Sequence, residues 1–166
     1  MARSAVQNFM KQQGFGPDAP ERLLAHFRGL QFQPIVVGSL MLVGIVTQSA
    51  PLFLALSAVL WLNALAPQAN PFEAVYNRFV ARPRGRPELR AAPLPRRFAQ
   101  GMAAAFALIA GAAILQGWTA VAYTAQGFIA VAFSALLFGK FCLGAYVYHL
   151  LKGNAAFANG TCPWSD

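Results

Sequence analysis

Three residues near the C-terminal end of the sequence have side chains suited to chemistry: Lys140, Cys142 and His149. They lie in an otherwise apolar stretch, LLFGKFCLGAYVYHLL, at positions 136–151. A thiol can exchange with disulfides and handle sulfur, an imidazole can ligate haem iron or chlorophyll magnesium, and an ammonium group can bind an anion or serve an ion pathway. Which chemistry is open to each residue depends on the element that carries it.

The composition indicates a membrane protein. Of the 166 residues, 57% are hydrophobic and 11% are charged, whereas soluble domains have about a quarter charged residues. The apolar residues form four blocks, 34–47, 51–66, 101–115 and 128–151, in which Lys140 is the single charged residue. The helices of a soluble bundle would have a polar face, and these blocks have none. We therefore predict an all-α polytopic fold of four transmembrane helices, paired as two hairpins.

Nearly all arginines and lysines precede the first block or lie between the second and third, and the other two connections have no charge. By the positive-inside rule, both termini face the cytoplasm across a bacterial inner membrane. The predicted regions are a cytoplasmic N-terminal segment (1–31), a transmembrane domain (32–151) with a cytoplasmic Arg/Pro-rich loop (67–98), and a cytoplasmic tail (152–166). The net charge of +8 then favours anionic phospholipids as partners over nucleic acid.

Two stretches have the spacing of amphipathic helices. Leu23, Leu24, Phe27 and Leu30 share one helical face, and a second apolar stripe runs over positions 72–80. We predict two short interfacial helices, the second followed by an extended, solvated Arg/Pro segment. The side chains expected at the lipid headgroups are Arg78, Arg82, Arg84, Arg86, Arg96, Arg97, Trp61, Tyr146 and Tyr148.

Small residues recur at helical spacing in the third and fourth blocks. Ala103, Ala107 and Gly111 lie in the third, and Ala135 and Gly139 in the fourth. Such residues let membrane helices approach closely. We predict that these two helices form the structural centre, although alanine is also simply common in bacterial membrane proteins.

Two short motifs resemble a known family. Arg-Phe-Ala-Gln-Gly stands at 97–101, at the start of the third block, and Phe-Cys-Leu-Gly at 141–144 in the fourth. In these motifs the chain resembles DUF4395, a family of small bacterial integral membrane proteins of unknown function, over about residues 32–151. The family pattern has a second cysteine where this chain has Ala145, so the Cys-x-x-Cys pair that the resemblance implies is incomplete. The resemblance supports the architecture and brings no activity.

The three candidate functional residues each keep an ordinary alternative. Cys142 lacks the nearby partner of a redox pair and can be a packing residue, and we expect no disulfide with Cys162. Lys140 either snorkels to the interface, contacts an anionic partner or lines an ion pathway. His149 is an interfacial hydrogen-bonding residue or, as the weaker alternative, a ligand of haem or chlorophyll. We expect no catalytic group, no metal site and no cofactor apart from bound lipid.

These features favour a non-catalytic accessory or scaffold subunit of a larger membrane complex, respiratory or photosynthetic, with other integral membrane subunits as partners. The alternatives are a membrane thiol-redox or sulfur-handling protein that uses Cys142, and a small transporter. The sequence does not identify the partner complex or the oligomeric state.

Overall fold

The computed structural model describes residues 2–16 and 20–162, and all regular structure within these ranges is helical. The predicted all-α class is therefore confirmed. The helices are α1 (Ala2–Gln12), α2 (Pro20–Thr47), α3 (Ala50–Leu65), α4 (Pro71–Tyr76), α5 (Leu94–Leu115), α6 (Thr119–Leu137), α7 (Leu143–Leu151) and α8 (Ala155–Gly160).

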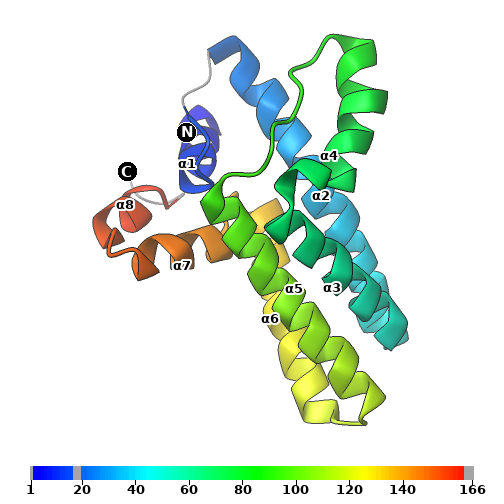
Figure 1. The fold of residues 1–166 in the computed structure, drawn as a ribbon. Helices are drawn as coiled ribbons and strands as arrows, with labels where there is room; N and C mark the ends of the chain where they lie inside the picture. Colours follow the sequence, from blue (N-terminus) through cyan, green and yellow to red (C-terminus); the bar gives the residue numbers. More distant parts are fainter. Residues whose placement is uncertain (1, 17–19, 163–166) are drawn as a thin grey trace.

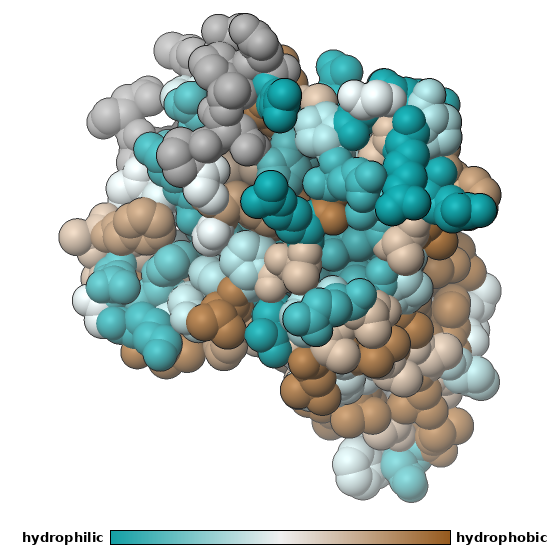
Figure 2. Space-filling view, turned by 45° about the horizontal axis from the view of Figure 1, so that its top comes forward, coloured by the Kyte–Doolittle hydropathy of each residue, from teal (hydrophilic) through white to brown (hydrophobic). Residues whose placement is uncertain are grey.

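Three of the described helices, α2, α5 and α6, are long and apolar enough to cross a membrane, and α3 is a shorter apolar helix of 16 residues. Viewed from the side drawn in Figure 2, the surface is hydrophobic over one end of the molecule and largely hydrophilic over the other. This distribution is typical of a membrane protein. Of the four predicted membrane-spanning helices, three are supported by the length and composition of the observed helices.

The long helices α2, α3, α5 and α6 run alongside one another, while α1, α7 and α8 gather at one end (Figure 1). We call this the α1/α7 end, and the opposite end, which carries the α2–α3 and α5–α6 connections, the turn end. The bundle core includes Val37, Phe53, Leu60, Ala107 and Ile129.

Helices α3 and α5 make the most extensive helix–helix contact. A Cβ on Gly111 would lie 2.9 Å from Leu54 Cγ, and Ser57 Oγ donates a hydrogen bond to the carbonyl of Ala104 at 2.8 Å. Small residues on α5 permit this approach. Helix α5, which contains the third block, packs on α3 and also on α6 and α7, which contain the fourth block.

Helix α2 is longer than the sequence predicted. The sequence predicted an interfacial helix followed by a separate first span, but α2 continues from Pro20 to Thr47 with Pro34 inside it. A proline removes the hydrogen bond to the carbonyl four residues earlier, which is that of Leu30. Arg96 Nη2 donates to this carbonyl at 3.4 Å, so a side chain of α5 supplies the missing donor.

The predicted fourth span, 128–151, is wrong. Helix α6 begins at Thr119 and ends at Leu137, so most of the predicted connection 116–126 is helical and the break falls later. Lys140 adopts a left-handed conformation with φ 50°, and Phe141 N–H donates to the carbonyl of Ala135 at 3.1 Å. A left-handed residue turns the chain out of the helix, and α7 then runs across the bundle end (Figure 1). Apolar composition alone does not reveal such a break.

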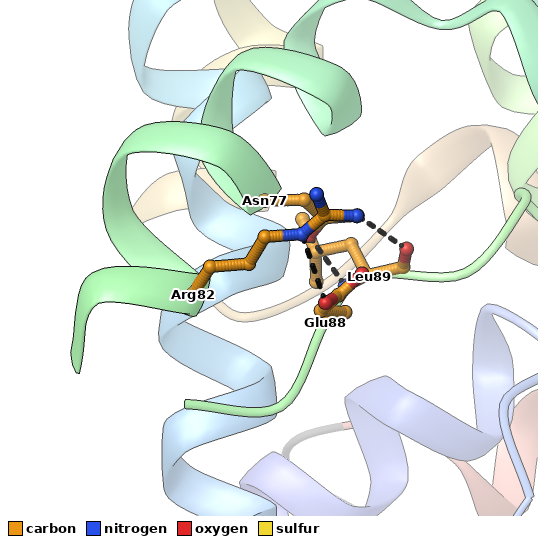
Figure 3. Close-up of polar contacts among 4 residues, drawn as sticks. All are labelled: Asn77, Arg82, Glu88 and Leu89. Carbon is orange, nitrogen blue, oxygen red and sulfur yellow. Dashed lines mark hydrogen bonds and ion pairs between the residues drawn. The ribbon is translucent and has the colours of Figure 1, made fainter. Parts of the chain in front are cut away.

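The Arg/Pro segment is anchored to the protein. Asn70 caps α4 by accepting from Phe72 N–H at 3.0 Å, and α4 continues into a π-helical turn, Asn77–Ala81. The Asn77 side chain brackets the backbone of Leu89, donating to its carbonyl at 2.9 Å and accepting from its N–H at 2.7 Å (Figure 3). Leu89 is buried, so this part of the segment is not solvated as predicted.

Candidate ligand-binding site

Four buried polar side chains meet at the α1/α7 end: Gln33 on α2, Asn70 before α4, and Arg96 and Gln100 on α5. We call them the polar cluster. Gln33 Oε1 accepts hydrogen bonds from Gln100 Nε2 at 3.1 Å, Asn70 Nδ2 at 3.2 Å and Arg96 Nη2 at 3.5 Å. One amide oxygen thus joins three separate parts of the chain.

Arg96 is the charged member of the cluster and is 5% exposed. Besides the Leu30 carbonyl and Gln33, it donates to Gln13 Oε1 at 3.4 Å, and its guanidinium lies 5.9 Å from the Phe15 ring centroid. All of these acceptors are neutral. The sequence placed Arg96 at the lipid headgroups, but the structure buries it inside the protein.

Arg97 has a different role from its neighbour. Its Nε donates to the Ala64 carbonyl at 2.7 Å and its Nη2 to the Leu65 carbonyl at 3.4 Å, at the last residues of α3. A basic side chain at a helix C-terminus satisfies carbonyls that have no partner within the helix. Among the other predicted headgroup residues, those exposed are Trp61, Arg78, Arg82, Arg84 and Arg86.

A cavity of about 90 Å³ lies beside the polar cluster. Its polar side is formed by Arg96, Gln33, Gln100 and Gln13, and Cys142 lines it at the start of α7. The rest of the wall is apolar and consists of Pro34, Val37, Leu60, Ala99, Ala103, Ala132, Phe133, Leu136, Leu143 and Gly144. The site is therefore a mostly apolar chamber with a guanidinium and three amides in its wall.

Cys142 is the candidate residue that the fold brings to this cavity. It is 6% exposed and precedes the first residue of α7. Burial is the main influence on the thiol and raises its pKa, while hydrogen bonds from the backbone of Ala145 and Gly144 and the charge of Arg96 act in the opposite direction. The raised pKa keeps the thiol neutral at physiological pH.

Lys140 and His149 do not line the cavity. Lys140 is partly exposed in the turn before α7. His149 Nε2 lies 2.9 Å from the carbonyl of Gln12, at the end of α1, and its ring packs 4.7 Å from that of Phe157. The contact with a carbonyl requires Nε2 to be the protonated nitrogen. His149 therefore donates a hydrogen bond from α7 to the end of α1.

The side chain of Gln12 makes a second contact at this end of the protein, because its Oε1 accepts a hydrogen bond from Cys142 N–H at 2.9 Å.

Tyr146 and Tyr148, predicted at the interface, are both partly buried. The hydroxyl of Tyr146 donates to Asn159 Oδ1 at 2.9 Å, and Tyr148 packs against Phe98 with 5.7 Å between ring centroids. Both tyrosines therefore contribute to contacts of α7 within the protein.

The small residues named in the sequence have separate roles. Ala107 and Gly111 are buried, and Ala103 lines the cavity. The carbonyl of Ala135 accepts the hydrogen bond from Phe141 N–H in the turn that follows α6, and Gly139 lies exposed in this turn. The closest small-residue crossing was missed by sequence reasoning: a Cβ on Gly144 would lie 2.6 Å from Cα and Cβ of Ala99, where α7 crosses α5.

Sequence reasoning also missed the buried amides Gln12, Gln13, Gln33 and Gln100. A signal was present for two of them, because Gln33 borders the first apolar block and Gln100 lies inside the Arg-Phe-Ala-Gln-Gly motif. Polar groups at membrane depth are costly unless partnered. In the described ranges no group of three or more His, Cys, Asp or Glu side chains is placed to hold a metal ion.

Residues 27–152 match the protein family described as a domain of unknown function, DUF4395. The match covers more than half of the chain and both motifs, which the structure brings together at the α5–α7 crossing. No curated protein and no solved structure gives a significant match.

Proposed function

The chain belongs to the DUF4395 family, and for this member we propose the role of a non-catalytic accessory or scaffold subunit in a larger bacterial membrane complex of the respiratory or photosynthetic type. In this proposal the α1/α7 end and both termini face the cytoplasm. The basic segment 67–98 meets anionic headgroups there, through the exposed arginines between Arg78 and Arg86.

The observation that carries the proposal is how little of the membrane-type helices the protein covers itself. In the most apolar stretches of α2, α5 and α6, 39%, 33% and 22% of the residues are buried. Helix α6 is the least covered and exposes Phe128 and Val131 by 54% and 63%. Helices of other subunits can pack on such a surface through van der Waals contacts.

The polar cluster supports the same role. Its hydrogen bonds join α2, α5 and the start of α4, and Gln13 links it to the segment after α1. Hydrogen bonds between separate elements hold those elements in a fixed arrangement. A rigid unit presents its outer surface to a partner with little loss of conformational entropy.

The test is photo-crosslinking in native membranes combined with mass measurement of the gently extracted protein. A photoreactive phenylalanine derivative replaces Val131 on α6, and Leu42, 61% exposed on α2, serves as the matched position. We expect a discrete protein adduct from position 131 and a stoichiometric partner in the native mass spectrum. A stable monomer whose position-131 adducts are all lipid would contradict the proposal.

The position of Cys142 favours thiol chemistry as a second candidate function. The thiol borders the cavity, and although burial raises its pKa, the backbone N–H groups of Gly144 and Ala145 and the charge of Arg96 act in the opposite direction. In this case the thiolate attacks one sulfur of a low-molecular-weight disulfide; the S–S bond breaks, a mixed disulfide forms, and the released thiolate takes up a proton. Absence of mixed-disulfide formation with oxidised glutathione in native membranes, compared with a Cys142→Ala control, would rule this candidate out.

A further inference from the structure

We propose that the cavity beside Arg96 binds the carboxylate end of a single-chain amphiphile of the fatty-acid class. This site shares the polar cluster with the scaffold role above, but the proposal does not depend on that role. Three features of the site support this ligand class: the charge of Arg96, the apolar wall of the cavity and its shape.

Arg96 has a positive charge that the described residues do not neutralise by contact. It is 95% buried by surface area, and none of its acceptors is a carboxylate. Its three hydrogen bonds measure 3.4, 3.4 and 3.5 Å, whereas charge-assisted hydrogen bonds to carboxylates are about 2.7–2.9 Å. These bonds come from Nη1 and Nη2, and Arg96 lines the cavity, where its guanidinium can donate to a ligand.

Glu73 is the acidic side chain that interacts electrostatically with Arg96, but no hydrogen bond joins the two in the described part of the chain. Glu73 is itself buried, and its Oε1 has no hydrogen-bond partner. Its burial raises its pKa, which weakens it as a counterion. A buried cation without a close counterion is costly, and a bound anion would remove that cost.

The cavity wall selects the kind of anion. Beyond the polar side, the wall is formed by aliphatic and aromatic side chains such as Val37, Leu60 and Phe133. A small inorganic anion would lose its hydration there without compensation. A carboxylate fits one planar guanidinium in a bidentate geometry, and its methylene groups gain free energy against the apolar wall.

The shape of the cavity favours a single-chain ligand. Its volume is about 90 Å³ and one side is open, so the carboxylate and the nearest methylene groups would lie inside and the rest of the chain would leave through the open side. A phospholipid would have to place a phosphodiester, a glycerol and two acyl chains beside the same single guanidinium. Gln100 Oε1, buried without a partner, can accept from a water that accompanies the carboxylate.

The test uses palmitate with a photoreactive diazirine in its chain, added to the full chain in nanodiscs. Three variants are compared with the wild type: Arg96→Gln removes the charge, Ala103→Leu fills the cavity, and Arg97→Gln is the matched control because its guanidinium faces α3. Labelling should be saturable, and peptide mapping should locate it at the cavity. Arg96→Gln and Ala103→Leu should lower labelling at this site by about tenfold or more, and Arg97→Gln should not.

Competition in the wild type identifies the ligand class even if a variant fails to fold. Unlabelled palmitate should displace the probe, while methyl palmitate, which has the same chain and no charge, should not. Equal competition by the methyl ester would overturn the proposal. Stronger competition by lysophosphatidic acid than by palmitate would also overturn it, in favour of a phosphate ligand. Full labelling of a folded Arg96→Gln variant would contradict the role of the guanidinium.

Discussion

The two ends of the helix bundle differ in how completely the polar side chains between the helices find hydrogen-bond partners. At the turn end, Gln48 and Gln126 form a closed pair in which each Nε2 donates to the other's Oε1 at 3.1 Å. At the α1/α7 end, Gln33 accepts from three donors through one oxygen, while Gln100 Oε1 and Gln12 Nε2 have no partner.

The difference separates a structural contact from a candidate site. A closed amide pair satisfies its own donors and acceptors and joins α6 to the α2–α3 connection, so it leaves little capacity for a ligand. A cluster with a charged donor, unused hydrogen-bonding atoms and an adjoining cavity can gain free energy from a bound molecule. The predictions below test this contrast, in order of decreasing effect.

The largest effect is expected at the α5–α7 crossing. Gly144→Ala places a Cβ 2.6 Å from Ala99 Cα. Because this Cβ is fixed to the backbone of α7 and the Ala99 Cα is part of the backbone of α5, the clash is relieved only if the helices move apart. We expect a loss of about 3 kcal/mol in the free energy of unfolding, measured by denaturation in detergent. Gly127→Ala on α6 is the control: its Cβ meets nothing within 4 Å, so the change should stay below about 1 kcal/mol. Equal effects of the two substitutions would contradict the close crossing.

The polar cluster should be more sensitive than the amide pair. Gln33→Leu leaves Asn70, Gln100 and the charged Arg96 without their common acceptor and should cost about 2–3 kcal/mol. Gln126→Leu leaves one amide and should cost about 1 kcal/mol. Thermal or chemical denaturation of both variants gives the comparison.

Double variants sharpen this second prediction. Replacing both Gln48 and Gln126 by Leu removes donors and acceptors together and should restore most of the stability that Gln126→Leu loses. Gln33→Leu combined with Gln100→Leu should show no such recovery, because Arg96 and Asn70 still lack their acceptor. Recovery in both pairs would remove the distinction between the two ends.

A third prediction concerns Cys142 and pH. Burial raises the pKa of its thiol above the ordinary value of 9.0, so the folded state favours the neutral form. Its contribution to stability is complete below about pH 9 and is lost as the pH rises through the folded-state pKa. In a Cys162→Ala background, unfolding free energy should fall more between pH 8 and 10 with Cys142 than with Cys142→Ala. Parallel pH profiles would contradict the burial of the thiol.

The smallest effect is expected for the ion pair between Arg82 and Glu88, which lies on the surface of the Arg/Pro segment (Figure 3). The two side chains are 61% and 51% exposed and 3.1 Å apart. Arg82→Ala should change the unfolding free energy by about 0.5 kcal/mol or less. Asn77→Ala removes the two hydrogen bonds to the backbone of the buried Leu89 and should lower the unfolding free energy by about 1 kcal/mol. A larger effect for Arg82 would show that charge at this end matters more than buried hydrogen bonding.

The sequence predicted the helical class, the apolar helices and the family motifs, because composition and short-range spacing carry this information. It did not predict the polar cluster, since Gln33 and Gln100 meet only after α2 and α5 have packed. It also did not distinguish Arg96 from Arg97. Successive residues on a helix point about 100° apart, and only the position of α3 decides which arginine faces inward. The end of α6 at Leu137 is not marked by a change in mean hydropathy, because only Gly139 and Lys140 interrupt the apolar residues on either side of the break.

Helix α1 precedes the segment that matches the family, yet its end completes that segment's hydrogen bonding. Gln12 accepts from the Cys142 backbone, and the adjacent Gln13 accepts from Arg96. A protein reduced to residues 27–152 would have both donors exposed at the cavity without these acceptors. Water, a ligand or a segment of another subunit would have to replace them. The end of α1 therefore supplies hydrogen-bond acceptors from outside the family motifs, and under the proposal above its sequence would affect the affinity of the site without any change in these motifs.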